Sequence, residues 1–551
     1  MEFQHGLAFL DSDQAAHYTR CKRMVELYGL YLDQSVMGSG KTYVALALAQ
    51  SLGLSLLVVG PKSSLGMWEE KAKEYHVPVL TTLSFQSLTG IGKGQPKHGM
   101  LVKNREKDDN GDETTSYTPH PTWVEQCKAT QGLLLVVDEA HNCKNPGNKE
   151  KAVAALVKAV REARAGGAKA YYALLSASLM EKDHMCIQFL RVLGFYTKRS
   201  LMDNLRGTRP GYDEIVRACL AVAPQATQGR AFASSAIQVA PAVLHENVYH
   251  LFTQAVLPAL SSSVPDPVLP SKMSNVYYKV LNPTLVARLQ KSQAGLAQAV
   301  RFDPTQQTVR MDSSSIAAVN RACMDHEWAL AEVAVREAWA WLEKNPTGKV
   351  IAFTNYKQTL YFVHHHLEKS GVKAVKYEGK MTTGQRVAAV RAFQEDDSTR
   401  AFVSNLSCGG VSISLHDVLA PRPRLVLIFP TYKILDVYQA TGRAVRRGMR
   451  TEADVRMIYS ADYPLLHMFN ALAKKTGVLK EVNKGATEQT RRKYPGEFPR
   501  GDVPYERGVE AGGNYSKTWH AAQERFPHQD LFKAEAAEAA EAAGEDEDDE
   551  E

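Results

Sequence analysis

Residues 35–42 form a short stretch that could hold phosphate groups. The stretch reads Ser-Val-Met-Gly-Ser-Gly-Lys-Thr and lies between an apolar run and a helix-forming run. In such a strand-to-helix turn the glycines let backbone N–H groups surround phosphates, the lysine neutralises the terminal phosphates and the threonine hydroxyl ligates Mg²⁺. Ser35 stands where the usual pattern has glycine, so a turn that binds nothing remains an alternative. The residues predicted to contact a nucleotide are Gly38, Ser39, Gly40, Lys41 and Thr42.

A pair of acidic residues, Asp138 and Glu139, follows the apolar run 133–137. A carboxylate at the carboxyl end of a buried parallel strand can face a phosphate-binding turn on the neighbouring strand and hold Mg²⁺, and an adjacent carboxylate can orient the attacking water. Acidic residues are also common in the first turn of a helix. Their position about 100 residues after a Gly-Lys-Thr turn favours the metal-binding interpretation.

Two arginines near the end of the chain, Arg443 and Arg446, are spaced three residues apart. On a helix this spacing places both on one face, and a planar guanidinium suits the charge that develops on a transferring γ-phosphoryl group. A solvated basic helix face and a nucleic-acid patch are the alternatives. By itself the run does not decide between them.

Two series of alternating strand and helix patterns must position these groups. The apolar runs 56–59, 77–84, 133–137 and 171–175 belong to the first series, and 349–353, 372–377, 401–403, 425–429 and 455–459 to the second. Such alternation predicts two parallel sheets. Residues 91–121 are polar and predict an exposed insertion, and residues 181–265 are helix-like with several breakers.

Composition limits the class of protein. The 551 residues are 44% apolar and 23% charged, which suits a globular protein of two to four domains. We find no 18-residue apolar span and no signal-peptide pattern, so we expect an intracellular protein that does not enter a membrane. The seven cysteines stand singly, which argues against disulfides and a zinc site.

The net charge of +6 hides an uneven distribution. Residues 534–551 carry ten acidic side chains and no basic one, which leaves +16 on the first 533 residues. A basic body favours a polyanionic partner such as nucleic acid, although a basic solvated surface is the alternative. Residues 476–533 read as a basic extension whose aromatics could stack on bases or pack against a lobe, and the acidic tail is predicted to be disordered.

Taken in order, these motifs resemble those of superfamily 2 helicases and translocases, most closely the Swi/Snf-type DNA-dependent ATPases. The most specific match is Asp-Glu-Ala-His at 138–141 followed by Lys-Asn-Pro at 144–146. At four positions in or near the coupling motif and the fifth motif, the sequence departs from the residues usual in the family. These positions bear on how tightly ATP hydrolysis is coupled to nucleic acid. The other matching positions are 37–42, 61–63, 68–69, 175–178, 269–272, 378–379, 386, 393, 404–415, 430, 432, 439, 442, 443 and 446, and the departures are Leu179, Ser412, Ser414 and Lys433.

The resemblance implies an α/β fold of two tandem RecA-like parallel-sheet domains with a helical insertion between them. The lobes would span 1–200 and 269–475, with a helical subdomain or linker at 201–268. ATP and Mg²⁺ would bind between the lobes, with Thr42 and Asp138 as metal ligands. Glu139, Asp138, Arg443, Arg446 and Gln439 would act in catalysis, Gln4 would read the adenine, and Lys62, Ser63, Thr354, Ser407 and Tyr432 would contact nucleic acid.

Three functions follow from this pattern. The first is an ATPase that moves along double-stranded DNA by gripping its backbone. A helicase that separates DNA or RNA strands would use the same ATP residues. A viral-type transcription factor with a vestigial ATPase is the third. In compactness the chain resembles Swi/Snf-like helicases of large DNA viruses. We expect the protein in the nucleus or cytoplasm, or in the host cell or virion if it is viral, and the acidic tail could bind protein partners.

Overall fold

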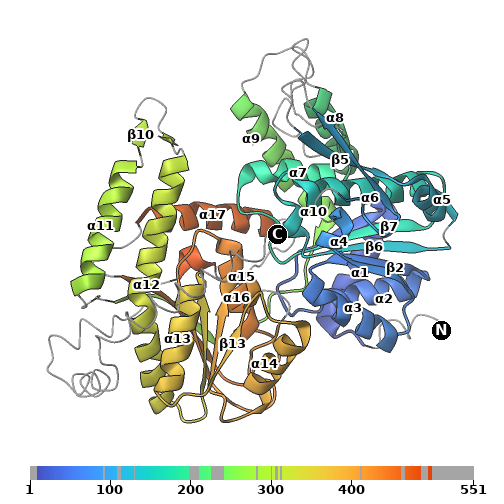
Figure 1. The fold of residues 1–551 in the computed structure, drawn as a ribbon. Helices are drawn as coiled ribbons and strands as arrows, with labels where there is room; N and C mark the ends of the chain where they lie inside the picture. Colours follow the sequence, from blue (N-terminus) through green and yellow to red (C-terminus); the bar gives the residue numbers. More distant parts are fainter. Residues whose placement is uncertain are drawn as a thin grey trace.

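The computed structural model describes most of the chain between residues 9 and 498. The described ranges are 9–90, 94–107, 113–129, 131–197, 210–224, 241–278, 280, 283–299, 301–303, 308–310, 313–409, 413–460, 466–484 and 494–498. Gln4, Ser412, most of the basic extension and the whole acidic tail lie outside these ranges. The described residues form two lobes, each built on a six-stranded parallel sheet (Figure 1).

The sheet of the first lobe has the strand order β3-β2-β6-β7-β1-β8. Nearly continuous apolar strands allow helices to cover both of its faces. Helices α1 to α3 cover one face around Trp68, and α6 covers the other around Leu156. The elements are β1 (Leu30–Asp33), β2 (Ser55–Gly60), β3 (Val79–Ser84), β6 (Leu133–Asp138), β7 (Ala170–Leu175), β8 (Ser261–Ser262), α1 (Ser12–Tyr28), α2 (Lys41–Leu52), α3 (Lys62–Glu74), α4 (Phe85–Thr89), α6 (Asn148–Ala165) and the 3₁₀ turns η1 (Ala140–Cys143) and η2 (Asp183–Met185).

The strand order corrects one expectation. The strand that ends at Asp138 was expected beside the strand that precedes the phosphate-binding turn, but β7 lies between β6 and β1. Strand β7 ends at Leu175 and is followed by Ser176, so the carboxyl end of a third strand separates the two chemical groups. A run of apolar residues identifies a buried strand, but it does not specify the neighbours of that strand.

The polar insertion is also more ordered than its composition predicted. It contains an antiparallel hairpin of β4 (Leu101–Lys107) and β5 (Glu113–Pro119), followed by α5 (Pro121–Ala129). Leu101 and Tyr117 are buried in the core beside α6. Only one side of a two-stranded hairpin needs apolar residues, so most of the segment can remain polar.

The helices that follow share the core of the first lobe. Phe252 and Leu260 pack in the same cluster as Leu156 of α6, and β8 adds the sixth strand to the first sheet. Residues 241–262 therefore pack as part of this lobe, whereas the predicted subdomain began at 201. The helices are α7 (Cys186–Val192), α8 (Pro210–Val222), α9 (Pro241–Leu251), the π-helical turn η4 (Phe252–Val256) and α10 (Leu257–Leu260).

The second lobe has the strand order β13-β14-β12-β15-β16-β9, again all parallel. Between β9 and β12 two long helices project as an arm, with a short hairpin at its tip (Figure 1). The elements are β9 (Ser271–Tyr278), α11 (Pro283–Ala299), β10 (Arg301–Asp303), β11 (Thr308–Arg310), α12 (Ser313–Lys344), β12 (Lys349–Thr354), α13 (Lys357–Lys369), β13 (Ala374–Tyr377), α14 (Thr383–Glu395), β14 (Ala401–Asn405), α15 (Leu406–Gly409), β15 (Arg424–Ile428), α16 (Ile434–Ala444) and β16 (Ala453–Ser460).

Helix α17 (Leu466–Lys484) packs against both lobes. Leu472 lies in a core cluster of the second lobe, whereas Val482 is buried in the core of the first. The predicted boundary at residue 475 thus falls inside a helix. Past the helix, Tyr494 next to the 3₁₀ turn η5 (Pro495–Glu497) is fully buried, so this aromatic packs against a lobe and is not free to stack on a base.

Candidate active site

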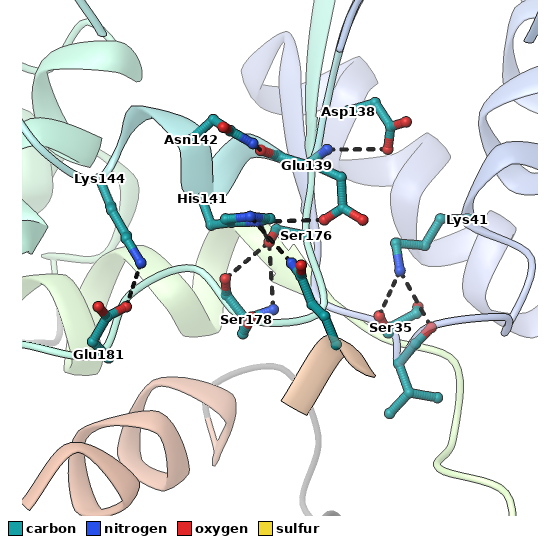
Figure 2. Close-up of polar contacts among 12 residues, drawn as sticks. Ser35, Lys41, Asp138, Glu139, His141, Asn142, Lys144, Ser176, Ser178 and Glu181 are labelled. Atoms are coloured by element: carbon teal, nitrogen blue, oxygen red, sulfur yellow. Dashed lines mark hydrogen bonds and ion pairs between the residues drawn. The ribbon is translucent and has the colours of Figure 1, made fainter. Parts of the chain in front are cut away.

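The phosphate loop at 35–42 connects β1 to α2. Gly38 and Gly40 have φ values of 75° and 96°, in the left-handed region that favours glycine, and α2 begins at Lys41 directly after them. The Nζ atom of Lys41 donates to the carbonyl oxygens of Ser35 at 2.9 Å and Val36 at 3.2 Å. The lysine is therefore held over the loop, where it can exchange these carbonyls for phosphate oxygens (Figure 2).

The acidic pair lies at the end of β6. Trp68 Nε1 donates to Asp138 Oδ2 at 3.1 Å, and the backbone N–H of Glu139 donates to Asp138 Oδ1 at 3.0 Å. Glu139 has a φ of 52°, a conformation that costs energy for a residue with a side chain and that aims its carboxylate toward His141 (Figure 2). Backbone strain of this kind is typical of active sites.

Burial and neighbouring charges separate the two carboxyl groups. Burial and the charge of Glu139 raise the pKa of Asp138. Burial would also raise the pKa of Glu139, but the hydrogen bond and charge of His141, together with Lys41 and Arg443, lower it to about 2. Glu139 is therefore ionised at neutral pH, the state needed to orient a water molecule.

His141 links the acidic pair to both lobes. Its Nδ1 atom lies 3.2 Å from Glu139 Oε2 and 3.2 Å from Ser176 Oγ, and its Nε2 atom lies 3.1 Å from Gln439 Nε2 of the second lobe. If the Gln439 amide donates to Nε2, the ring carries its proton on Nδ1 and donates to Glu139. Ser176 in turn donates to the carbonyl oxygen of Ser178 at 2.9 Å, so the predicted coupling motif contacts this network.

The two predicted arginines reach the first lobe. A Cβ atom placed on Gly38 would lie 2.6 Å from Arg446 Nε, so this side chain is directly against the phosphate loop. Arg443 is 3% exposed, and burial lowers its pKa to about 10, so it stays charged at neutral pH. The shared helix face was a wrong expectation, because α16 ends at Ala444 and Arg446 lies in the turn beyond it.

A hydrophobic contact also joins the lobes at the phosphate loop. Met37 is 9% exposed and belongs to a core cluster of the second lobe. Its side chain lies against Gly442 of α16 so closely that a Cβ atom at that glycine would overlap it. The loop is thus packed against the helix that carries Gln439 and Arg443.

The residues predicted to contact nucleic acid lie in two places: the start of α3 in the first lobe, and the carboxyl ends of the neighbouring strands β14, β12 and β15 in the second. Lys62 and Ser63 are exposed at the start of α3, and Ser407 is exposed on α15. Tyr432 is half-buried. Thr354 has no exposed surface and donates to the Tyr356 carbonyl oxygen at 3.3 Å, which argues against a direct contact. An apolar strand end that carries a threonine does not reveal whether the hydroxyl points outward.

Some functional contacts were not predicted from sequence. The sequence predicted His141 only as part of a motif and gave it no role of its own. Its contact with Gln439 joins residues 298 positions apart. The packing of Met37 against Gly442 was also missed. In the first case the available signal was a histidine two residues after a predicted catalytic carboxylate, and in the second a glycine inside a helix with no other need for it.

Comparisons with known proteins point to helicase-like relatives. Residues 331–448 match the Helicase conserved C-terminal domain. A putative ATP-dependent RNA helicase of Acanthamoeba polyphaga mimivirus is 23% identical over 473 residues, covering 84% of this chain and 81% of the relative. A second relative is the SWI/SNF-related matrix-associated actin-dependent regulator of chromatin subfamily A-like protein 1 homolog of Caenorhabditis elegans. It is 25% identical over 218 residues, covering 39% of this chain and 30% of the relative.

Among solved structures, the Sulfolobus solfataricus SWI2/SNF2 ATPase core in complex with dsDNA aligns with 86% of this chain and 96% of its own. The sequence identity is 14% and the TM-score is 0.29, a value too low to compare overall shapes. By the domain match and the relatives, this chain is similar to helicases. Over 218 residues it is also similar to a SWI/SNF-related protein.

One negative finding concerns membranes. Across the part of the chain that the structure describes, none of the helices combines the length and the apolar character needed to span a bilayer.

Proposed function

We propose that this protein is a nucleic-acid-dependent ATPase of the Swi/Snf type that moves along double-stranded DNA, driven by nucleotide-dependent contact between its two lobes. The observation that carries the proposal is the position of Arg446 against Gly38, with Gln439 beside His141. A site assembled from two lobes changes when ATP binds and again when phosphate leaves. Such cycles convert hydrolysis into relative movement of two surfaces that grip a strand.

The chemical roles follow from the site. The Lys41 ammonium and the N-terminus of α2 would bind the β- and γ-phosphates. Glu139, held ionised, would orient the attacking water, while Arg443 and Arg446 would stabilise charge on the transferring group. His141 would keep the Glu139 carboxylate in place and report its state to Gln439 and Ser176.

Thr42 and Asp138 fit a magnesium ion. Asp138 accepts from Trp68 and from a backbone N–H, yet a carboxylate has further lone pairs to offer. Hard oxygen ligands of this kind, together with nucleotide phosphates, are what Mg²⁺ prefers. When bound, the ion would neutralise charge on the β- and γ-phosphate oxygens. Gln4, which we predict to read the adenine, lies outside the described residues.

Duplex DNA is the proposed track for two reasons. The first 533 residues carry a charge of +16, which suits a phosphate backbone, and we find no module that would read bases. Lys62 and Ser63 at the exposed start of α3 would hold backbone phosphates. The C. elegans relative is named as a chromatin regulator, which agrees with a DNA substrate.

A strand-separating RNA helicase is the second candidate. It is favoured by the mimivirus relative, which is named a putative ATP-dependent RNA helicase and aligns with 84% of this chain. Both candidates use the same residues to hydrolyse ATP, so only the nucleic acid distinguishes them.

The decisive measurement is the ATPase rate with duplex DNA, single-stranded DNA and RNA, with Lys41→Ala as the inactive control. We expect duplex DNA to stimulate most strongly and a strand-displacement assay to show no unwinding. Stimulation by RNA alone would favour the second candidate. Full biological activity of Lys41→Ala would instead indicate a factor whose ATPase is vestigial.

A further inference from the structure

A third arginine, Arg447, joins the second lobe to the N-terminus of α1. Its Nη1 atom lies 2.6 Å from Asp11 Oδ2, and its Nη2 atom lies 2.9 Å from Asp13 Oδ2. One guanidinium therefore bridges two carboxylates of the other lobe, an arrangement that restricts its direction more than a single ion pair would. The Arg447 side chain is 26% exposed, so water screens the pairs only in part.

The contact continues from α1 into the phosphate loop. Asp11 caps α1 by accepting from the Gln14 backbone N–H at 2.8 Å, and its own N–H donates to Gln14 Oε1 at 3.1 Å. This reciprocal cap fixes the Gln14 side chain. The other end of that side chain, Nε2, donates to the carbonyl oxygen of Ser39 in the loop at 2.9 Å.

Ser39 contacts one of the two carbonyl oxygens to which Lys41 donates. The Ser39 hydroxyl donates to the Val36 carbonyl oxygen at 2.7 Å, and this oxygen also accepts from Lys41 Nζ. A continuous series of polar contacts thus runs from Arg447 through Asp11, Gln14 and Ser39 to the carbonyl from which Lys41 must detach to bind phosphate.

The anchoring of Arg447 also bears on Arg446. Arg446 lies past the end of α16, in a turn where Val445 is extended and Gly448 has a φ of 89°. The last helical hydrogen bond of α16 runs from the Val445 N–H to the Thr441 carbonyl oxygen at 3.0 Å, and beyond it the Arg446 carbonyl oxygen accepts from the Met449 N–H at 3.3 Å. Side-chain contacts add to these backbone bonds. Arg446 bonds to Ser414 Oγ at 2.5 Å within its own lobe, whereas Arg447 fixes the turn to the first lobe.

We propose that Arg447 is a positioning residue that aligns Arg446 with the phosphate loop and, through Asp11 and Gln14, holds the loop itself. This role rests on the proposed two-lobe mechanism and adds to it a link that sets the lobe arrangement. Arg447 does not touch the reacting phosphates. Substitutions at Arg447 are therefore expected to change kcat, whereas substitutions at Gln14 are expected to change the KM for ATP.

The test is a charge exchange between the lobes. Arg447→Glu faces Asp11 and Asp13 with a like charge and is expected to lower kcat by about tenfold, while Arg447→Ala costs about threefold. Asp13→Arg, which leaves the cap residue Asp11 in place, is expected to give a similar loss. The double variant Arg447→Glu/Asp13→Arg should return to within about twofold of the original kcat, since it restores an ion pair.

Gln14→Ala tests the other end. It should raise the KM for ATP by about fivefold with little change in kcat, because it frees the loop and leaves Arg446 in place. Arg450→Glu, a charge reversal at an exposed residue of the same region, is the matched control and should have no effect. Melting temperatures of all variants separate these effects from unfolding.

Two results would overturn the proposal: Arg447→Glu with unchanged kcat, or a double variant no better than the single ones. The same variants are also compared by the binding of a fluorescent ATP analogue. If the unmodified protein hydrolyses no ATP with any nucleic acid, the proposed function fails. The positioning role of Arg447 is then tested by nucleotide binding alone. Gln14→Ala should weaken binding of the ATP analogue, and adding Asp13→Arg to Arg447→Glu should restore the binding that Arg447→Glu loses.

Discussion

The two halves of the nucleotide site are held in different ways. In the first lobe, Lys41 and Asp138 are fixed by backbone groups and side chains of that same lobe. In the second lobe, Gln439 and Arg446 reach across to the first, and Met37 of the first packs into the core of the second. Under the proposed function, the first lobe would bind the nucleotide, whereas hydrolysis would require the second lobe to be in place.

The largest effects are expected from replacing one residue in each half of the site by alanine. Lys41→Ala should abolish nucleotide binding, because it removes the charge that faces the phosphates. Arg446→Ala should leave binding within a few-fold and lower kcat by about 10³, in the range measured for arginine fingers. Equilibrium binding of a fluorescent nucleotide and steady-state ATPase rates provide the two readouts. Equal losses of binding in both variants would contradict the division between the lobes.

A substitution at the contact between the phosphate loop and α16 is expected to have the next largest effect on kcat. Gly442→Ala adds a methyl group where Met37 lies, and relieving this overlap costs about 1–3 kcal/mol, which corresponds to a loss of about 5- to 150-fold in kcat if the lobes must separate. Gly384→Ala is the matched control, since nothing lies within 4 Å of that glycine. The double variant Met37→Ala/Gly442→Ala should recover most of the loss. If it does not, the packing contact is not what holds the lobes.

A smaller effect is expected at the polar contact between the lobes. Gln439→Ala leaves His141 Nε2 without its partner from the second lobe, and we expect kcat to fall by about tenfold with nucleotide binding unchanged. The stimulation of the ATPase by nucleic acid should fall together with the basal rate. An unchanged stimulated rate would place Gln439 outside the coupling path.

The smallest expected effect concerns the uneven charge of the chain. Deleting residues 534–551 removes ten acidic side chains and should raise duplex affinity a few-fold at low salt. Affinity of the full chain should also fall steeply as salt is added, because binding releases counterions. Fluorescence anisotropy with a labelled duplex measures both. A flat salt response would contradict the electrostatic argument.

The local patterns of the sequence were sufficient to place the main chemical groups. The phosphate loop, the acidic pair and the arginines were identified from residue type and spacing, and both parallel sheets from the alternation of apolar strands and helices. These features depend on neighbours within a few residues. Features set by distant neighbours were missed: the place of β7 between β6 and β1, the hairpin in the polar insertion and the burial of Thr354.

What the sequence by itself determined is therefore the chemical type of these groups: a glycine-rich turn with a lysine, a pair of carboxyl groups and two guanidinium groups. Only the tertiary structure decided how these groups meet. Gln439 contacts His141 across 298 residues, Met37 packs on Gly442, and Arg447 bridges Asp11 and Asp13. The physical reason is that a side chain's reactivity is local, whereas contacts between lobes depend on packing and charge pairing that no short stretch of sequence contains.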